Sequence, residues 1–465
     1  MLCLAAAVAL RVAALDQPLD RDSAAYAAIG RLLGPDELPY RDLFDHKQPL
    51  IHWVYAALYA IAPGSVAAIR VAAAVPSALA AGGLFAVLEG VAGRGRAALA
   101  AGLTVVLSAS TMLQGTDLNT EHLLVLPAAA TVLGALALGR ARCGAVPLAI
   151  GVLGGVAVLA KATGGLIALA ALIPLLAGRD ARGQSVLGTL VRFGAGLALP
   201  FGLVLAVYAA LGAADDLVFA NLTYNGRYVG DQGFALVPRG PGALAALAGA
   251  ALCCALVRLV SLRGRDVVGW TLLAWLAGAW LGAQTSSRGF PHYYVPLVAP
   301  AVALLVLPAA SPERPLVIAQ GAARLLAAAA ALLIALPLVQ DAGRSGEEIA
   351  VHVYGRDGVE LAEPADAVGS LLRRRGRAGD QLFVVGAEPE YYWRSGLAPY
   401  RRWLYDYPAE VAPERFLPDL AGLCRDGPRF VVLATLHLPA YARRCVAGGY
   451  AETLRRGPVV VLERR

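Results

Sequence analysis

The length of the apolar blocks in this sequence constrains the fold more than any other feature. Up to about residue 340, apolar stretches alternate with short polar loops. The stretches are roughly 17–25 residues long, which is the length of helix that crosses a bilayer. Hydrophobic residues make up 58% of the 465 residues and charged residues only 16%, whereas a soluble domain carries roughly 25% charged residues. The composition argues against a soluble globular enzyme, and the pattern predicts a polytopic α-helical membrane protein.

Most of the apolar blocks are long enough to be transmembrane helices, and we expect about eleven spans. The expected spans are residues 1–15, 66–91, 97–113, 121–139, 145–160, 163–178, 186–212, 241–262, 267–284, 291–309 and 315–340. The apolar stretch Leu50–Pro63 is too short to span comfortably, so we interpret it as an interfacial or re-entrant helix.

The arginines of the connecting loops indicate an orientation, because basic residues favour the cytoplasmic side of a membrane. With eleven spans, the arginine-rich loops fall on one side, which predicts a cytoplasmic N-terminus. The first external loop, 16–65, and the C-terminal region then lie outside. If Leu50–Pro63 crossed the bilayer, every later loop would change sides. The same arginines explain the net charge of +7 without a nucleic-acid partner.

Residues 341–465 are charged and contain no spanning block, so we expect two domains, 1–340 in the membrane and 341–465 outside. Buried strands are expected at Gln381–Ala387, Phe430–Leu436 and Val459–Leu462, with helices at Glu363–Arg377 and Ala409–Cys424. This alternation predicts a small α/β domain. Cys424 and Cys445 flank the second strand, and an exported domain permits a disulfide between them, although the sequence leaves the pairing open.

Polar residues gather in the loops expected outside the membrane, where charged groups at the membrane face usually line a site or pathway. The chain has only two lysines, and both lie in these loops. Candidate site residues are Asp20, Asp22, Tyr26, Tyr40, Asp42, His46 and Lys47 in the first loop, and Glu121, Lys161, Arg288, His292 and Tyr293 in later ones. Carboxylates beside cations could deprotonate a hydroxyl while holding an anionic phosphate.

Several short motifs occur in a familiar order. The first loop contains DSAAY at 22–26, LPYRD at 38–42 and DHKQPL at 45–50, and GTDLNTE follows at 115–121. Later motifs are AKATG at 160–164, FPHYYVPL at 290–297 and GAEPEYY at 386–392. Together they resemble class C glycosyltransferases (GT-C), namely the bacterial branch of the protein O-mannosyltransferase family 39 and the lipid A aminoarabinose transferases. The resemblance covers nearly the whole chain.

This resemblance implies roles for individual residues. Asp22 matches the catalytic carboxylate, the general base on the acceptor hydroxyl, and Glu121 matches a second acidic position. Lys47 matches the lysine that holds the donor phosphate, and Lys161 matches another lysine close to it. Two departures stand out, since Ser23 replaces a frequent second acidic residue and Gln48 replaces a proline after Lys47.

Structural explanations remain open for the same residues. Asp22 could cap a helix that begins at Ser23, and both lysines could be interfacial residues that reach toward water. Glu121 could be a charge favoured by a helix N-terminus. Arg41 and Asp42 could form a structural pair. His46 is the candidate ligand for a divalent metal, whose presence stays open.

The sequence therefore predicts an inverting membrane glycosyltransferase that moves a sugar from a polyprenyl-phosphate donor to an extracytoplasmic acceptor hydroxyl. The resemblance implies a multi-pass protein of the bacterial inner membrane, whose partners are the lipid-linked donor, the bilayer and an acceptor that could be a protein, a glycolipid or a glycan. A transporter or lipid-linked-sugar flippase is the main alternative, and a non-catalytic assembly or sensor protein is another.

Overall fold

The computed structural model describes residues 1–465 except 231–239, 286–287 and 309–312. By its internal contacts the chain divides into two compact units. Unit 1 comprises Met1–Leu15, Arg70–Val207 and Gln232–Arg344, and unit 2 comprises Asp16–Ile69, Tyr208–Asp231 and Ser345–Arg465. The expected division into a membrane domain, 1–340, and an outside domain, 341–465, stays a prediction.

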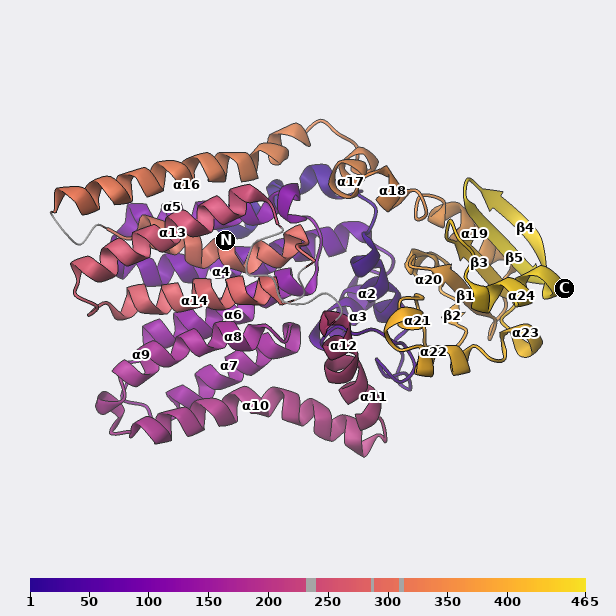
Figure 1. The fold of residues 1–465 in the computed structure, drawn as a ribbon, viewed down its shortest axis with the longest axis horizontal. Coiled ribbons are helices and arrows are strands. Elements are labelled where there is room, and N and C mark those ends of the chain that lie inside the picture. Colours follow the sequence, from indigo (N-terminus) through magenta and orange to yellow (C-terminus); the bar gives the residue numbers. More distant parts are fainter. Residues whose placement is uncertain (231–239, 286–287, 309–312) are drawn as a thin grey trace. The chain divides into compact units, whose positions relative to one another are not determined.

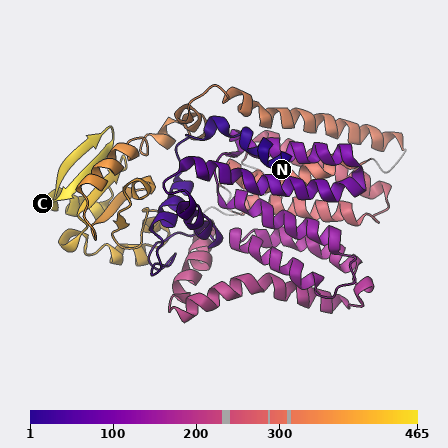
Figure 2. The ribbon, with the colours of Figure 1, turned by 180° about the vertical axis from the view of Figure 1, so that it is seen from behind.

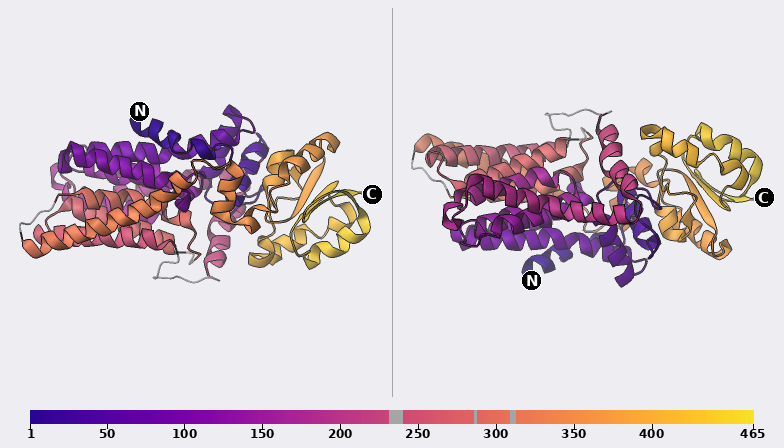
Figure 3. Two further views of the ribbon diagram at one scale, coloured as in Figure 1. Left: turned by 90° about the horizontal axis from the view of Figure 1, so that it is seen from above. Right: turned by 90° about the horizontal axis from the view of Figure 1, so that it is seen from below.

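Unit 1 is built from helices. Its elements are α1 (Leu2–Ala9), η1 (Val12–Ala14), most of α4 (Val66–Ala92), α5 (Arg94–Ala109), η2 (Thr111–Leu113), α6 (Thr120–Leu138), α7 (Val146–Ala160), α8 (Gly164–Ala168), η3 (Leu169–Ala171), α9 (Leu172–Ala177), η4 (Asp180–Arg182), most of α10 (Val186–Ala210), α13 (Gly242–Ser261), α14 (Val267–Gln284), η6 (Pro291–Leu297), α15 (Val298–Val306) and α16 (Arg314–Gln340). The long helices run alongside one another in all views, for example α13 with α16 and α6 with α7 (Figures 1, 2 and 3).

Within the described residues, six helices are long and apolar enough to cross a membrane: α4, α6, α10, α13, α14 and α16. Shorter apolar helices include α7 and the segments Gly164–Ala177 and Pro291–Val306. The prediction of a multi-pass helical membrane protein is thus supported, whereas the number of about eleven spans stays a prediction. The stretch Leu50–Pro63 forms a helix, α3 (Leu50–Ile61), of 12 residues.

Buried arginines brace the segment between α5 and α6 in unit 1. Arg70 and Asp117 form an ion pair, and both side chains are fully buried. Arg11 donates to the backbone oxygens of Gly115 at 2.7 Å and Ser108 at 3.1 Å. Because a buried charge is tolerated only when it is paired or hydrogen-bonded, these contacts fix the loop that leads into α6.

Unit 2 contains two helices from the first polar loop, α2 (Arg21–Leu32) and α3, which pack on each other. Gly30 permits their close approach, because a Cβ at this position would lie 2.6 Å from the Tyr55 carbonyl carbon. Three consecutive elements of unit 2 follow α10: α11 (Ala214–Val218), the π-helix η5 (Phe219–Tyr224) and α12 (Asn225–Gly230).

The rest of unit 2 is an α/β region. Its helices are α17 (Gly346–Tyr354), α18 (Arg356–Val359), α19 (Ala365–Arg375), α20 (Glu390–Ser395), α21 (Pro408–Val411), α22 (Pro413–Asp419), α23 (Leu423–Asp426) and α24 (Ala440–Gly449). Its strands are β1 (Gln381–Gly386), β2 (Ala398–Pro399), β3 (Phe430–Ala434), β4 (Tyr450–Arg456) and β5 (Val459–Arg464), in the spatial order β2-β1-β3-β5-β4. β1 pairs in parallel with β2 and β3, and β5 runs antiparallel to β3 and β4.

The predicted small sheet is confirmed, because β1, β3 and β5 match the three expected strands. The sequence did not predict β2, which has two residues, or β4, whose outward-facing side chains make its pattern polar. The single helix expected at Ala409–Cys424 is wrong: the stretch contains three short helices, and Pro413 separates the first from the second. The disulfide that the sequence permits between Cys424 and Cys445 falls on side chains outside the described residues.

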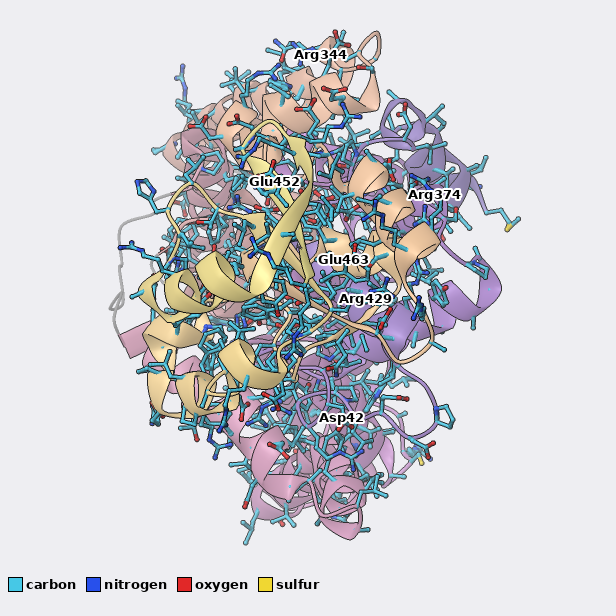
Figure 4. All side chains as sticks on the ribbon, turned by 90° about the vertical axis from the view of Figure 1, so that its right-hand side faces the viewer. Asp42, Arg344, Arg374, Arg429, Glu452 and Glu463 are labelled. Atoms are coloured by element: carbon cyan, nitrogen blue, oxygen red, sulfur yellow. The ribbon has the colours of Figure 1, made fainter. Side chains whose placement is uncertain are left out.

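An ion-pair network closes one end of this sheet. Arg429, just before β3, pairs with Glu463 of β5 at 2.9 Å and with Asp380, next to β1, at 2.7 Å. Figure 4 shows Arg429 and Glu463 near each other. The network therefore links the ends of three strands, β1, β3 and β5.

Candidate active site

Asp22 lies in the first turn of α2, and it does not cap that helix. The cap is Asp20, whose carboxylate accepts a hydrogen bond from the Ser23 backbone at 3.1 Å. The alternative in which Asp22 caps a helix is therefore wrong. The Asp22 side chain is 38% exposed, and its Oδ2 lies 3.4 Å from Nζ of Lys47. The structure thus brings Asp22, the base implied by the resemblance, next to Lys47, the implied phosphate ligand.

The loop that carries Lys47 is anchored by a buried carboxylate, Asp45, which is 2% exposed. Asp45 accepts hydrogen bonds from the His46 backbone N–H at 2.7 Å and the Tyr405 hydroxyl at 2.9 Å, and it bonds Nε2 of His52 at 2.9 Å. Burial acts to raise the pKa of Asp45, but the hydrogen bonds with His46 and His52 outweigh it and hold that pKa well below its ordinary value. Asp45 is therefore an ionised acceptor at neutral pH.

His46, the candidate metal ligand, is committed to other contacts. Its Nδ1 lies 3.1 Å from the Tyr405 hydroxyl, and its ring packs near Tyr224 and Tyr228. Burial and the charge of Lys47 lower the pKa of His46, so the ring is neutral at pH 7. Among the residues the structure describes, no group of three or more His, Cys, Asp or Glu side chains could hold a metal ion.

Three other residues predicted for this loop, Tyr26, Asp42 and Tyr40, contact neighbouring protein groups. Tyr26 is buried, with its ring 5.5 Å from that of Tyr55. Asp42 accepts hydrogen bonds from the Leu38 backbone at 2.8 Å and from Arg41 at 2.9 Å, so the alternative of an Arg41–Asp42 pair is confirmed. Tyr40 is buried and donates its hydroxyl to the Lys47 carbonyl at 2.8 Å. Tyr40 therefore touches the Lys47 backbone.

A second polar cluster lies within unit 1, around Lys161. The helix α7 ends at Ala160, and the Lys161 backbone is extended (φ −159°, ψ 135°). Lys161 forms an ion pair with Glu121 in the first turn of α6, whose side chain is 3% exposed. Nζ of Lys161 lies 4.3 Å from the centre of the Tyr293 ring. Nε2 of His292 lies 3.8 Å from Glu121, so four of the five residues predicted in the later loops meet here.

The surroundings of this cluster are close-packed. A cavity of about 10 Å³ is lined by Glu121, Lys161 and Tyr293, among others, which is roughly the space of one water molecule. Nδ1 of His292 is hydrogen-bonded to Gln114, a residue with a left-handed backbone (φ 53°). The fifth residue, Arg288, is exposed in the segment before η6.

Unit 2 also contains a larger cavity of about 370 Å³ beside the start of α2. Carboxylates dominate its walls, and two arginines accompany them: Asp16, Asp20, Arg21, Glu347, Glu363, Asp366, Glu388, Glu390 and Arg394. Nε of Arg21 lies 2.7 Å from Glu388. Burial raises the pKa of Glu388 to about 7, although the Arg21 charge opposes this.

Several residues that shape these clusters were missed by the sequence analysis. Asn225 donates to the His46 carbonyl at 2.7 Å from 179 positions along the chain, and Tyr405 reaches Asp45 from 360 positions away. Gln114 and Glu388 were also missed as site residues. No local pattern marks such residues, because the contacts that give them a role depend on the tertiary fold.

The chain is similar to known glycosyltransferases. The sequence profile of the family described as dolichyl-phosphate-mannose-protein mannosyltransferase matches residues 46–211. No curated protein matches the chain. Among solved structures, ArnT from Cupriavidus metallidurans bound to undecaprenyl phosphate has a TM-score of 0.63 at 17% identity, over 99% of this chain and 97% of that one.

A second similar structure is the archaeal oligosaccharyltransferase AglB from Archaeoglobus fulgidus, in complex with an inhibitory peptide and a dolichol-phosphate. It has a TM-score of 0.54 at 13% identity, over 93% of this chain and 68% of that one. At these identities the structural likeness shows a shared fold. The resemblance to class C glycosyltransferases predicted from the sequence is confirmed by the profile match and by the fold that this chain shares with ArnT and AglB.

Proposed function

We propose that this chain is a membrane glycosyltransferase that transfers a sugar from a polyprenyl phosphate to the hydroxyl of an extracytoplasmic acceptor. The protein would be a multi-pass protein of the bacterial inner membrane, with its N-terminus in the cytoplasm. Support comes from the family profile, and from a fold shared with a structure that holds undecaprenyl phosphate and another that holds dolichol-phosphate.

The proposed reaction is a single displacement at the anomeric carbon. The Asp22 carboxylate takes the proton of the acceptor hydroxyl while that oxygen forms a bond to the anomeric carbon. The bond from this carbon to the phosphate oxygen breaks, and its electron pair leaves on the polyprenyl phosphate. Attack from the face opposite the leaving group inverts the anomeric configuration, and Asp22 then releases the proton to water.

The observation that carries this proposal is the Asp22–Lys47 pair. A base must reach its substrate, and the Asp22 side chain is 38% exposed although it lies 3.4 Å from an ammonium group. Lys47 supplies a positive charge next to that base, where it can stabilise the charge that develops on the leaving phosphate. Because the attacking and leaving oxygens lie on opposite faces of the anomeric carbon, the two side chains would move apart when donor and acceptor bind between them.

We assign a supporting role to the cluster in unit 1. Lys161 could hold a phosphate of the lipid carrier, as the resemblance implies. Glu121 is buried and already paired with Lys161, so we propose that it positions this lysine. The second acidic position implied by the resemblance would then act through Lys161 and not on the acceptor itself.

The test measures release of undecaprenyl phosphate by the purified full-length protein in proteoliposomes. A panel of undecaprenyl-phosphate-linked hexoses and pentoses serves as donor, with cell-envelope extract as acceptor and mass spectrometry as readout. We expect Asp22→Asn to lower kcat by about 10²–10⁴-fold, the usual contribution of a general base. Asp20→Asn is the matched control, since it removes a carboxylate two residues away and asparagine caps a helix equally well.

Two results would contradict the proposal. One is an Asp22→Asn protein that folds normally and transfers sugar at the wild-type rate. The other is a wild-type protein that releases no undecaprenyl phosphate from any donor but moves a lipid-linked sugar across the bilayer, which would favour the flippase alternative.

A further inference from the structure

We propose that the peptide units of His46 and Lys47 are held by a clamp of three side chains, Tyr40, Asp45 and Asn225, which positions Lys47 for its phosphate. This inference rests on the proposed function, because it assigns to the clamp the task of aiming a phosphate ligand. It adds positioning residues that act through Lys47 and do not themselves touch the substrate.

The clamp binds three backbone groups: the N–H of His46, the carbonyl of His46 and the carbonyl of Lys47. Asp45 accepts from the His46 N–H at 2.7 Å, Asn225 donates to the His46 carbonyl at 2.7 Å, and the Tyr40 hydroxyl donates to the Lys47 carbonyl at 2.8 Å. The three groups come from the loop itself, from the segment before it and from α12. Because each backbone group is fixed by a different side chain, the Lys47 backbone has little freedom to shift.

Two of the clamp residues, Asp45 and Asn225, are themselves held by further contacts. Asp45 bonds His52 of α3 and Tyr405 of the C-terminal region, and Tyr405 also reaches Nδ1 of His46. Asn225 donates further bonds, each 3.2 Å long, to the carbonyls of Ala220 and Asn221. The C-terminal α/β region therefore contributes directly to the loop that carries the phosphate ligand.

Two unusual backbone features build the clamp. Tyr40 has a left-handed backbone (φ 73°), a conformation that is costly for a bulky residue and persists only where the surroundings impose it. Asn225 directly follows the π-helix η5, and π-helical turns are rare and often occur at functional sites. These two irregular backbone segments thus place donors against two adjacent carbonyls: Asn225 against that of His46 and Tyr40 against that of Lys47.

The physical benefit is preorganisation. A lysine side chain loses conformational entropy when a phosphate fixes it. If the Lys47 backbone were also mobile, each binding event would cost additional conformational entropy. Small misplacements of a positioning group commonly cost orders of magnitude in rate. At metal sites, the residues that orient the ligands typically contribute 10–100-fold in affinity. We expect the clamp to contribute about tenfold to the affinity for a lipid phosphate.

The clamp can be tested by removing one hydroxyl. Tyr40→Phe deletes the bond to the Lys47 carbonyl but keeps the ring. Tyr450→Phe is the matched control, because the Tyr450 hydroxyl donates to the Pro428 carbonyl at 2.9 Å within the C-terminal region. Asn225→Asp removes the other donor with little change in shape, and Arg227→Ala is its control on the same helix, since Arg227 pairs with the exposed Glu414.

Two readouts separate positioning from a general loss of structure. The first is the Kd of undecaprenyl phosphate for the full chain in nanodiscs, measured together with the thermal midpoint. The second is the NMR spectrum of protein labelled with ¹³C at lysine Cε. The chain has only two lysines, so Lys161 is an internal reference for Lys47.

We expect Tyr40→Phe and Asn225→Asp to weaken lipid-phosphate binding by about tenfold. The Lys47 signal should shift or broaden, the Lys161 signal should stay in place, and both control variants should behave as wild type. The clamp is overturned if Lys47→Gln abolishes binding but Tyr40→Phe and Asn225→Asp leave both Kd and the Lys47 signal unchanged. If Lys47→Gln itself binds undecaprenyl phosphate as wild type does, the assignment of phosphate to Lys47 in the proposed function fails instead.

Discussion

The two lysines of this chain each pair with a carboxylate, one in each unit, and the two pairs differ in their carboxylates. Lys47 and Lys161 have similar exposed fractions, 18% and 20%. Asp22, the partner of Lys47, is 38% exposed, whereas Glu121, the partner of Lys161, is only 3% exposed and in closer contact. The accessible carboxylate suits a base that must exchange protons with a substrate, and the enclosed one suits a group that holds a cation in place.

The comparison teaches that matching a motif does not by itself fix a role. By resemblance, Asp22 and Glu121 are both acidic positions of a catalytic face. Their surroundings distinguish them, because a buried carboxylate already paired with an ammonium has little capacity left for an acceptor hydroxyl. Variants of the two carboxylates can break this distinction, and variants of Glu388, Tyr293 and Arg41 extend the comparison to other enclosed and exposed groups.

The largest expected contrast lies in the effect on folding of removing each carboxylate charge. Glu121→Gln should lower the free energy of unfolding by about 2–4 kcal/mol, because it leaves Lys161 beside an enclosed and uncharged partner. Asp22→Asn should change it by less than about 1 kcal/mol, as expected for a more exposed pair. Thermal unfolding in detergent measures both, and equal losses for the two variants would end the distinction.

The buried Glu388 provides a pH test within unit 2. Its pKa is raised by burial to about 7 from an ordinary value of 4.5, so the folded protein keeps a proton that the unfolded chain releases. Between about pH 4.5 and 7 the free energy of unfolding should therefore fall as pH rises, by roughly 2–3 kcal/mol in total.

Thermal midpoints of wild type and Glu388→Gln at pH 5 and pH 8 check this dependence. The wild type should lose more stability than the variant over that interval, because glutamine cannot titrate. Parallel pH curves for the two proteins would mean that Glu388 ionises normally.

A smaller effect should follow from the aromatic contact of Lys161. Tyr293→Leu removes the ring that lies 4.3 Å from Nζ of Lys161 and should cost about 1–2 kcal/mol of stability. Tyr293→Phe keeps the ring face and should cost less. If the phenylalanine variant is as unstable as the leucine variant, the tyrosine hydroxyl matters and the ring does not.

The smallest effect is expected at the rim of the first loop. Arg41 and Asp42 form an ion pair at 2.7 Å whose side chains are 37% and 35% exposed. Because exposed pairs contribute little, Arg41→Ala should change the free energy of unfolding by less than about 1 kcal/mol. A loss as large as that of Glu121→Gln would show that this loop is held from its surface and not by the Asp45 cluster.

The sequence predicts the membrane character, three of the five strands and the meeting of Asp22 with Lys47. These depend on local composition, short-range patterns and a recognisable order of motifs. It does not predict that Asn225 and Tyr405 hold the Lys47 loop, or that Asp20 rather than Asp22 caps α2. The first depends on contacts between residues 179 and 360 positions apart. The second depends on which of two nearby aspartates the backbone turns toward the helix end.

The most direct test of the central claim is the position of a lipid phosphate in a cryo-electron microscopy structure of the full chain with undecaprenyl phosphate. The account predicts density for the phosphate with an oxygen about 3 Å from Nζ of Lys47, the distance of a charge-assisted hydrogen bond. Phosphate density that is well resolved but away from Lys47, with the Asp22–Lys47 pair unchanged, would contradict it.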